Sequence, residues 1–190
     1  MTRSGVQPTT ARRSDLLDAL ADLFLAEGFM SFTLDQLTER LRCSKSTLYT
    51  LAPSKEQLSR TVIKHYFRRS AAAVEDKVSA VDGDVEVYLN SVAEELRPAQ
   101  PAFYRDLDLF PPGREVYEQN VVYATQRVQE LIAKGVAAGV YRPVDSEFVA
   151  DLIANALARI GRGEVARATG IDDSRAFQLL SDTVMGGLRA

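Results

Sequence analysis

The sequence predicts an all-α fold of about nine helices, with a small N-terminal three-helix unit over residues 1–65 and a larger helical unit over 66–190. Apolar residues recur at three- and four-residue intervals in nearly every segment, and no segment shows the alternation of a half-buried strand. Caps and turn residues separate these segments. With 46% hydrophobic residues among 190, the chain can bury a core of ordinary size.

The first helix is predicted over residues 10–27, where leucines and a phenylalanine form one apolar stripe. Gly28 follows at the position where a helix commonly stops. A second helix begins at Thr33, because Thr33 and Gln36 form a capping box in which each side chain satisfies a backbone N–H of the opening turn.

A short turn then leads into a third helix. Arg42 and Cys43 occupy the turn, Ser44 is the expected N-cap, and Pro53 ends the helix. Two short, capped helices joined by a tight turn and covered by a preceding helix have the layout of a helix-turn-helix. For Cys43, packing as a small hydrophobe is the default interpretation.

The rest of the chain continues in helical periods. A long helix opens at the second capping pattern, Ser54 to Gln57, and the turn signals at 82–84 and 111–113 separate later elements. The predicted elements are helices over 54–81, 85–96, 114–138, 146–168 and 174–188, and a short apolar-aromatic segment over 103–110.

The composition excludes several classes of protein. No apolar run approaches the roughly 18 residues of a membrane span, and residues 1–13 are polar and basic without the apolar stretch of a signal peptide. One cysteine cannot form an internal disulfide, and one histidine makes a catalytic triad or a His-based metal site hard to assemble. We therefore expect a soluble, cytoplasmic protein with no catalytic site, metal site or cofactor.

The formal net charge of −3 hides an uneven distribution. Residues 40–69 hold eight basic side chains and one acidic side chain, Glu56. Such a concentration inside an acidic protein fits an anion-binding face, and the alternative is an ordinary solvated helix surface.

The third predicted helix has little bulk on its outer side. Its small hydroxyl side chains, one phenol and one lysine can approach a DNA groove closely and hydrogen-bond there. The N-termini of the second and fourth helices carry Thr33 and Lys55, and free N–H groups at such ends suit phosphate. Alternatively, Thr33 is only a cap, Tyr49 packs between helices and Lys55 is a solvated surface residue. The predicted DNA-binding residues are Thr33, Ser44, Lys45, Ser46, Thr47, Tyr49, Thr50 and Lys55.

These motifs resemble the TetR family of ligand-responsive repressors. The resemblance covers about fifty residues and is carried by Phe29, Thr33-Leu34, Leu37, Leu41, Ser44 to Tyr49 and Ser54 to Leu58, and more weakly by residues 139–145. Arg42 stands where the family usually has glycine. Leu51 and Ala52 stand where it commonly has histidine or an aromatic residue and then phenylalanine, so the packing beneath the third helix is expected to differ.

The resemblance implies a sequence-specific regulator that binds double-stranded DNA and is released by a small-molecule effector. It implies that Thr33, Tyr49 and Lys55 contact phosphates and that the other exposed residues of the third helix face the major groove. It also implies a homodimer on a pseudo-palindromic operator, formed by the last two long helices. The expected dimer residues are Phe148, Leu152, Ile153, Ala156, Leu157, Ile160, Phe177, Leu180 and Val184; the alternative for them is an ordinary monomer core.

Aromatic residues gather in the middle of the chain, where a mostly apolar effector pocket with a few polar anchors can form. The candidate ligand-binding residues are Tyr88, Phe103, Tyr104, Phe110, Tyr117, Tyr123 and Arg127, and plain core packing is the alternative for the aromatic ones. Arg105 is a further candidate anchor. Two other functions stay open at this point: a helical protein-binding adaptor whose head no longer reads DNA, and a small helical enzyme.

Overall fold

The computed structural model describes residues 10–81 and 83–189, so most of the basic N-terminal stretch lies outside it. Within that part the chain forms ten helices and no strand, which confirms the all-α prediction. The helices are α1 (Thr10–Glu27), α2 (Leu34–Arg40), α3 (Lys45–Tyr49), α4 (Lys55–Ser79), α5 (Val85–Leu96), α6 (Pro101–Leu109), α7 (Pro111–Ala137), α8 (Ser146–Gly161), α9 (Glu164–Thr169) and α10 (Asp173–Leu188).

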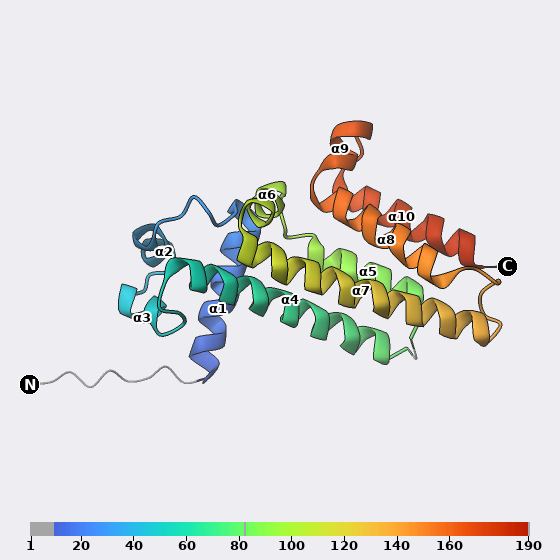
Figure 1. Ribbon diagram of the computed structural model, residues 1–190, viewed down its shortest axis with the longest axis horizontal. Coiled ribbons are helices and arrows are strands. Elements are labelled where there is room, and N and C mark those ends of the chain that lie inside the picture. Colours follow the sequence, from blue (N-terminus) through green and yellow to red (C-terminus); the bar gives the residue numbers. More distant parts are fainter. Residues whose placement is uncertain (1–9, 82, 190) are drawn as a thin grey trace, which may run out of the picture.

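The molecule is elongated, with α2 and α3 at one end (Figure 1). Helix α1 crosses α4, and α4 runs from the head, which we define as α1 to α3, into the helical body. Helices α4, α5 and α7 extend along the body, while α8 and α10 pack together on its other side. One continuous helix, α4, therefore joins the head to the body.

Polar side chains fix where several body helices begin. Ser54, Asp84, Asp145 and Asp172 are the N-caps of α4, α5, α8 and α10, and each accepts a hydrogen bond from the backbone N–H three residues later. A cap of this kind satisfies one of the amide groups that have no partner within the helix. Short polar motifs thus set the start of the long elements.

Two helix boundaries differ from the sequence prediction. Helix α7 begins at Pro111 instead of residue 114, because the two prolines occupy its first turn, where the missing N–H costs nothing. The single helix predicted over 146–168 is two helices, α8 and α9. Gly163 lies between them at φ 67°, a left-handed conformation that interrupts the helical backbone.

The interior holds two large apolar clusters along the long axis. The first joins α1 to α4 with α6 and the start of α7, and includes Phe24 and Phe103. The second lies farther along α4 and α7, against α5, α8 and α10, and includes Leu131, Ile132 and Ile153. Because residues of the head and of α6 pack in the same cluster, we expect a movement of α6 to change the packing of the head.

The division at residues 65 and 66 stays a prediction, and α4 crosses it without a break. Among the described residues, no helix combines the length and apolar character that crossing a membrane requires.

Candidate nucleic-acid interface

The cap of α2 has the geometry that the sequence predicts. The Thr33 side chain accepts from the Gln36 N–H at 3.2 Å, and the Gln36 side chain accepts from the Thr33 N–H at 2.8 Å. Leu37 is fully buried against the head core, which orients the helix. Thr33 itself is exposed, so its hydroxyl lies on the surface at the positive end of the α2 dipole.

Helix α3 is only five residues long and is organised by its cap, Ser44. The Ser44 oxygen accepts from the Thr47 N–H at 3.2 Å and lies 2.7 Å from the Ser46 hydroxyl and 2.8 Å from that of Thr47. Leu48 is 1% exposed and anchors the helix in the core. Lys45, Ser46, Tyr49 and Thr50 are exposed and Thr47 is half-buried, so α3 presents a polar outer face.

The packing beneath α3 rests on Leu51 and Ala52, which are both buried in the first core cluster. The turn before α3 contains Arg42 at φ 50°, the one non-glycine residue with positive φ among those described. A side chain in this conformation costs roughly 1 kcal/mol. The turn that brings α2 to α3 is therefore the same left-handed turn that a glycine would adopt without strain.

A guanidinium from α1 holds the end of α3. Arg13 donates from Nη1 to the Thr50 carbonyl at 2.6 Å and from Nη2 to the Leu51 carbonyl at 3.3 Å. These carbonyls follow the last turn of α3, where the backbone has unsatisfied acceptors and a partial negative charge. No local sequence signal points to this contact, because 37 residues separate Arg13 from Thr50.

We expect Arg13→Ala to lower the free energy of unfolding by about 1 kcal/mol, since two charge-assisted bonds to carbonyls are lost. Urea unfolding followed by circular dichroism measures this difference. Arg12→Ala is the matched control, because Arg12 is exposed and makes no hydrogen bond to another described residue. Equal losses in the two variants would contradict the assignment.

The lysine of α3 already has a partner within the head. Lys45 Nζ lies 2.7 Å from Asp35 Oδ1, and both side chains are largely exposed. The hydrogen bond to Asp35 raises the pKa of Lys45, so the ammonium group stays charged. Since solvent screens such an exposed pair strongly, the lysine can exchange Asp35 for a phosphate or a base edge at little cost.

The start of α4 is tied back to the loop after α1. Lys55 Nζ donates to the Met30 carbonyl at 2.8 Å, and burial lowers the pKa of Lys55 while nearby Asp106 opposes that effect. Asp106 on α6 is 6% exposed, and its Oδ2 accepts from the Phe29 N–H at 2.7 Å and the Met30 N–H at 2.8 Å. Lys55 on α4 and Asp106 on α6 therefore both form hydrogen bonds with the backbone of the loop between α1 and α2.

Glycine is required in that loop. Gly28 has φ 79°, and a Cβ at this position would lie 2.7 Å from Asp106 Oδ2. The residue that ends α1 thus also makes room for the carboxylate of α6.

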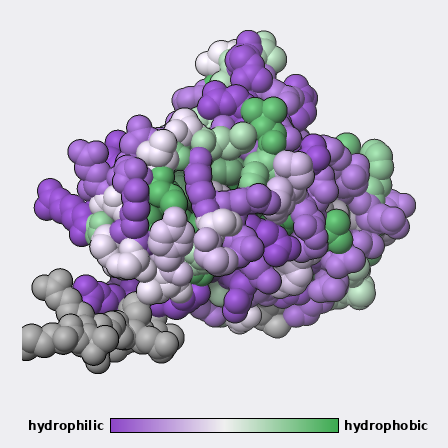
Figure 2. Space-filling model, turned by 60° about the vertical axis from the view of Figure 1, so that its left-hand side comes forward, coloured by the Kyte–Doolittle hydropathy of each residue, from purple (hydrophilic) through white to green (hydrophobic). Residues whose placement is uncertain are grey.

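The fold neutralises much of the basic segment over residues 40–69. Four of its basic side chains form ion pairs with acids that lie outside that segment in the sequence. The pairs are Arg40–Glu27, Lys45–Asp35, Arg60–Glu115 and Arg69–Asp18. Arg42, Lys64 and Arg68 have no ion pair within residues 10–81 and 83–189. The count along the sequence therefore overstates the free positive charge, and the end of the molecule shown in Figure 2 has a mixed, mainly hydrophilic surface.

The single histidine joins α4 to α1. His65 Nε2 lies 2.8 Å from Asp18 Oδ1, and Arg69 Nη1 lies 2.6 Å from the same oxygen. Burial alone would raise the pKa of Asp18, but the hydrogen bonds from His65 and Arg69 outweigh it and lower that pKa. The carboxylate is therefore ionised at neutral pH and fixes α1 against α4.

A cavity of about 100 Å³ lies in the body between α4, α5, α6, α7 and α8. Four of the candidate ligand-binding residues line it: Tyr88, Tyr104, Tyr117 and Tyr123. The Tyr104 ring packs against Gly161 of α8, where an added Cβ would lie 2.5 Å from the ring carbon Cζ.

The other three candidates lie outside the cavity lining. Phe103 is 2% exposed within the first core cluster, and Phe110 packs on that cluster from its edge. Arg127 binds Glu75 through two bonds of 2.8 and 3.1 Å. Phe103 of α6 lies against the rings of Tyr66 and Phe67 on α4, and both phenylalanines lie against the ring of Phe29. Periodicity alone does not reveal these contacts. Arg105 is exposed at the surface.

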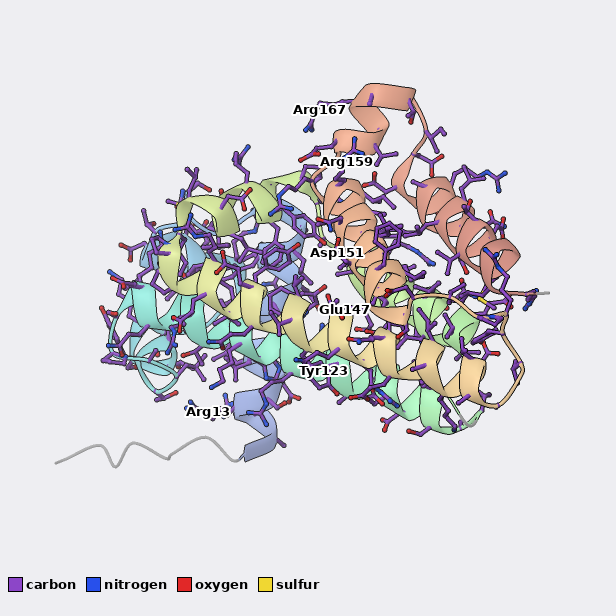
Figure 3. The ribbon with its side chains drawn as sticks, turned by 45° about the vertical axis from the view of Figure 1, so that its right-hand side comes forward. Arg13, Tyr123, Glu147, Asp151, Arg159 and Arg167 are labelled. Carbon is purple, nitrogen blue, oxygen red and sulfur yellow. The ribbon has the colours of Figure 1, made fainter. Side chains whose placement is uncertain are left out.

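The candidate dimer residues fall into an exposed group and a group that faces the interior of the chain. Phe148 and Leu152 of α8 are 61% and 52% exposed, and Ala156 is half-buried. Figure 3 shows charged neighbours of this row, Glu147 and Asp151, following one another along α8. The remaining candidates face the interior of the chain: Ile153 and Leu157 line the cavity, Ile160 and Phe177 are buried, and Leu180 and Val184 pack against core clusters.

Cys43 in the turn is half-buried, and burial raises the pKa of its thiol. Within the described ranges, no group of three or more histidine, cysteine, aspartate or glutamate side chains has the arrangement of a metal site.

The head matches a known family of DNA-binding regulators. Residues 16–62, from α1 into α4, match the model of the bacterial regulatory proteins of the tetR family. No curated protein matches the chain.

Solved structures share the whole fold at low sequence identity. A transcriptional regulator from Saccharomonospora viridis in complex with choline is 17% identical, with 96% of this chain and 100% of that chain covered and a TM-score of 0.71. A TetR-family regulator from Cytophaga hutchinsonii is 18% identical, with 96% and 98% covered and a TM-score of 0.71. The ketosteroid regulator KstR2 of Mycobacterium tuberculosis is 19% identical, with 96% and 97% covered and a TM-score of 0.62. These similarities show that the body as well as the head has this fold.

Proposed function

We propose, from the match of residues 16–62 to the tetR-family model, that this chain is a dimeric repressor released from its operator by a small molecule. The observation that carries the proposal is the outer face of α3. Lys45, Ser46, Tyr49 and Thr50 are exposed there while Leu48 fixes the helix from behind. A short helix with this face can enter the major groove.

The proposed contacts divide into two classes. Thr33, Tyr49 and Lys55 would contact phosphates from the ends of the helices, which positions the head on the duplex. Lys45, Ser46, Thr47 and Thr50 would face the bases, with Ser44 holding their helix in place. Lys55 would have to share its ammonium group between the Met30 carbonyl and a phosphate, since Met30 already accepts one of its bonds.

Two heads are needed to read a pseudo-palindromic operator. Phe148 and Leu152 form an apolar, exposed row on α8 that no other described residue covers. Exposed apolar rows bounded by charges are typical of protein interfaces. We propose that α8 and α10 pair with the same helices of a second subunit, which places the two copies of α3 about one turn of DNA apart, or a multiple of that.

An effector acts only if it prefers one arrangement of the dimer over another. The cavity lies against α4, which continues into the head, and against α6, which holds the loop after α1 through Asp106. The regulator from Saccharomonospora viridis, which has the same fold, was solved in complex with choline, and this supports a small-molecule effector for the present chain. We expect the protein to act in the cytoplasm, where its DNA is.

Binding to the DNA beside its own gene tests the proposal. We expect the purified chain to retard this DNA in a mobility-shift assay at low salt, and the affinity to fall as salt increases. No binding to any neighbouring intergenic DNA would overturn the proposal.

Two lysine variants distinguish a contact with the DNA bases from non-specific electrostatic attraction to DNA. We expect Lys45→Ala to lower the ratio of specific to random DNA affinity about ten-fold, because Lys45 lies on α3. Lys64→Ala is the control: this exposed lysine of α4 lies outside α3 and should leave the ratio unchanged. Equal ratios for the two variants would refute the role of Lys45.

A further inference from the structure

The cavity in the body is walled by aromatic rings. Six rings line it, from Tyr66, Phe67, Tyr88, Tyr104, Tyr117 and Tyr123. Burial raises the pKa of four of the tyrosines, namely residues 66, 88, 104 and 117, so their phenols are neutral at physiological pH. The face of a neutral aromatic ring is electron-rich and attracts cations.

One fully buried side-chain oxygen in the lining lacks a well-formed hydrogen bond. Ser70 on α4 is 8% exposed, and its Oγ lies near the Tyr66 hydroxyl but makes no hydrogen bond of normal geometry to any described residue. Leaving such a hydroxyl unsatisfied costs about 1–3 kcal/mol. Tyr66 and Tyr88 differ in this respect, because their hydroxyls donate to the carbonyls of Glu95 and Ala124. Ser70 therefore marks a place where an occupant of the cavity can accept or donate a hydrogen bond.

The charge of the lining has one sign. Glu75 and Glu95 line the cavity, and none of the lining residues is Lys, Arg or His. Two guanidinium groups next to lining residues are already paired: Arg127 with Glu75, and Arg162, which lies over the Tyr117 ring, with Asp108. The Glu95 carboxylate makes no ion pair with another described residue, and Lys77, which interacts with it electrostatically, is ion-paired with Glu94. The cavity thus has one carboxylate that is not in an ion pair.

We propose that this cavity binds a compact organic ammonium ion with an apolar, ring-sized body. The ammonium group would lie between Glu95 and the tyrosine faces and donate to Ser70 Oγ, and the apolar part would contact the aliphatic walls. This inference rests on the proposed effector role and names the chemistry of the effector.

Two alternatives are less favourable on physical grounds. An anion would meet the Glu95 carboxylate, and no lining residue is a cation that could offset the repulsion. A large hydrophobic ligand would need the walls to move, because the cavity is about 100 Å³ and one of 150 Å³ holds only a molecule the size of benzene. A ligand with a single ring would therefore keep part of its body at the open side of the cavity. Tyr123, labelled in Figure 3, is a lining residue that is 49% exposed, so the cavity lining reaches the surface at this residue.

Three probes share one ring and a similar size but carry different charges: benzylamine, which is protonated at neutral pH, neutral benzyl alcohol and anionic benzoate. We expect isothermal titration calorimetry of the full chain at pH 7 to show benzylamine binding at least ten-fold more tightly than benzyl alcohol. Benzoate should bind most weakly. Benzoate binding as tightly as benzylamine, or no preference between the amine and the alcohol, would overturn the proposal, and so would a lack of binding by all three.

Adjacent residues of α5 provide a matched pair of variants. Glu95→Gln should reduce the preference for benzylamine over benzyl alcohol to about two-fold, because it removes the charge and keeps the shape. Glu94→Gln should leave the preference unchanged, since Glu94 is exposed, pairs with Lys77 and lies outside the lining. An unchanged preference in Glu95→Gln, with the thermal melt of the parent chain retained, would refute the role of Glu95.

The hydroxyl of Ser70 is tested separately. Ser70→Ala should weaken benzylamine several-fold and leave the melting temperature of the free protein unchanged or higher, because the orphaned hydroxyl disappears. Stronger binding of benzylamine by Ser70→Ala would contradict its place in the site. All of these measurements record ligand binding in the absence of DNA. If the ligands do not bind, the proposal that the chain binds an operator is unaffected. If the mobility-shift assay fails, the ligand measurements can still be interpreted.

Discussion

Replacing Asp106 by alanine is expected to lower the free energy of unfolding by about 2–4 kcal/mol. The carboxylate oxygen Oδ2 accepts bonds from the N–H groups of Phe29 and Met30, and the Phe29 bond is buried. Each buried donor left without a partner costs roughly 1–3 kcal/mol. The variant also leaves the Lys55 ammonium group without its nearby buried carboxylate.

A second acid on the same helix provides the comparison. Asp108 is exposed and pairs with Arg162 on the surface, so Asp108→Ala should cost less than about 1 kcal/mol. Asp106→Asn should fall between the two, because its amide oxygen can replace Oδ2 as acceptor. Urea unfolding gives all three values, and similar losses for Asp106→Ala and Asp108→Ala would show that the buried bonds contribute little.

The same substitution should weaken DNA binding beyond its effect on stability. Phe29 and Met30 lie in the loop between α1 and α2, so releasing them frees the head to change its angle to the body. Operator affinity measured well below the melting temperature should fall several-fold in Asp106→Ala and remain near that of the parent chain in Asp108→Ala.

Introducing two acidic residues on the exposed face of α8 is expected to abolish the proposed dimer. In the variant Phe148→Glu/Leu152→Glu, each subunit would bring two carboxylates to the interface, where they would be desolvated next to their copies. Operator affinity should fall at least one hundred-fold, because a single head makes half of the contacts. Sedimentation velocity should show a monomer.

The folded chain should tolerate this change, since both side chains are more than half exposed within one subunit. Val81→Glu is the control: Val81 is 48% exposed just after α4 and lies outside α8 and α10. This control should remain dimeric. A dimeric double variant with parental DNA affinity would exclude α8 as the interface.

Local signals predict the head well because they depend on neighbouring residues. Thr33 with Gln36, and Ser44 before α3, form the expected caps, since each bond closes within three residues. Gly28 ends α1 as predicted. The break at Gly163 escaped prediction, because a single glycine inside an apolar period is compatible with a continuous helix until the packing around it is known.

Long-range contacts could not be derived in the same way. Arg13 reaches the end of α3, and Asp106 reaches the loop after α1 across 77 residues. The acids that neutralise the basic segment likewise come from other helices, such as Glu27 and Glu115. Periodicity identifies which face of a helix is apolar, but it does not say which helix will cover that face. Phe103, a candidate ligand-binding residue by sequence, therefore lies in the first core cluster and outside the cavity lining.

Two neighbouring side chains in the middle of α6 connect this helix to both the body and the head. The Tyr104 ring lies against the bare backbone of Gly161 in α8, the helix proposed to join the subunits, and Asp106 holds the loop beside the DNA-reading head. A ligand that displaces the Tyr104 ring has no empty space to push it into on the side of α8. We therefore expect ligand binding to shift α6, and through it both the subunit contact and the loop before α2.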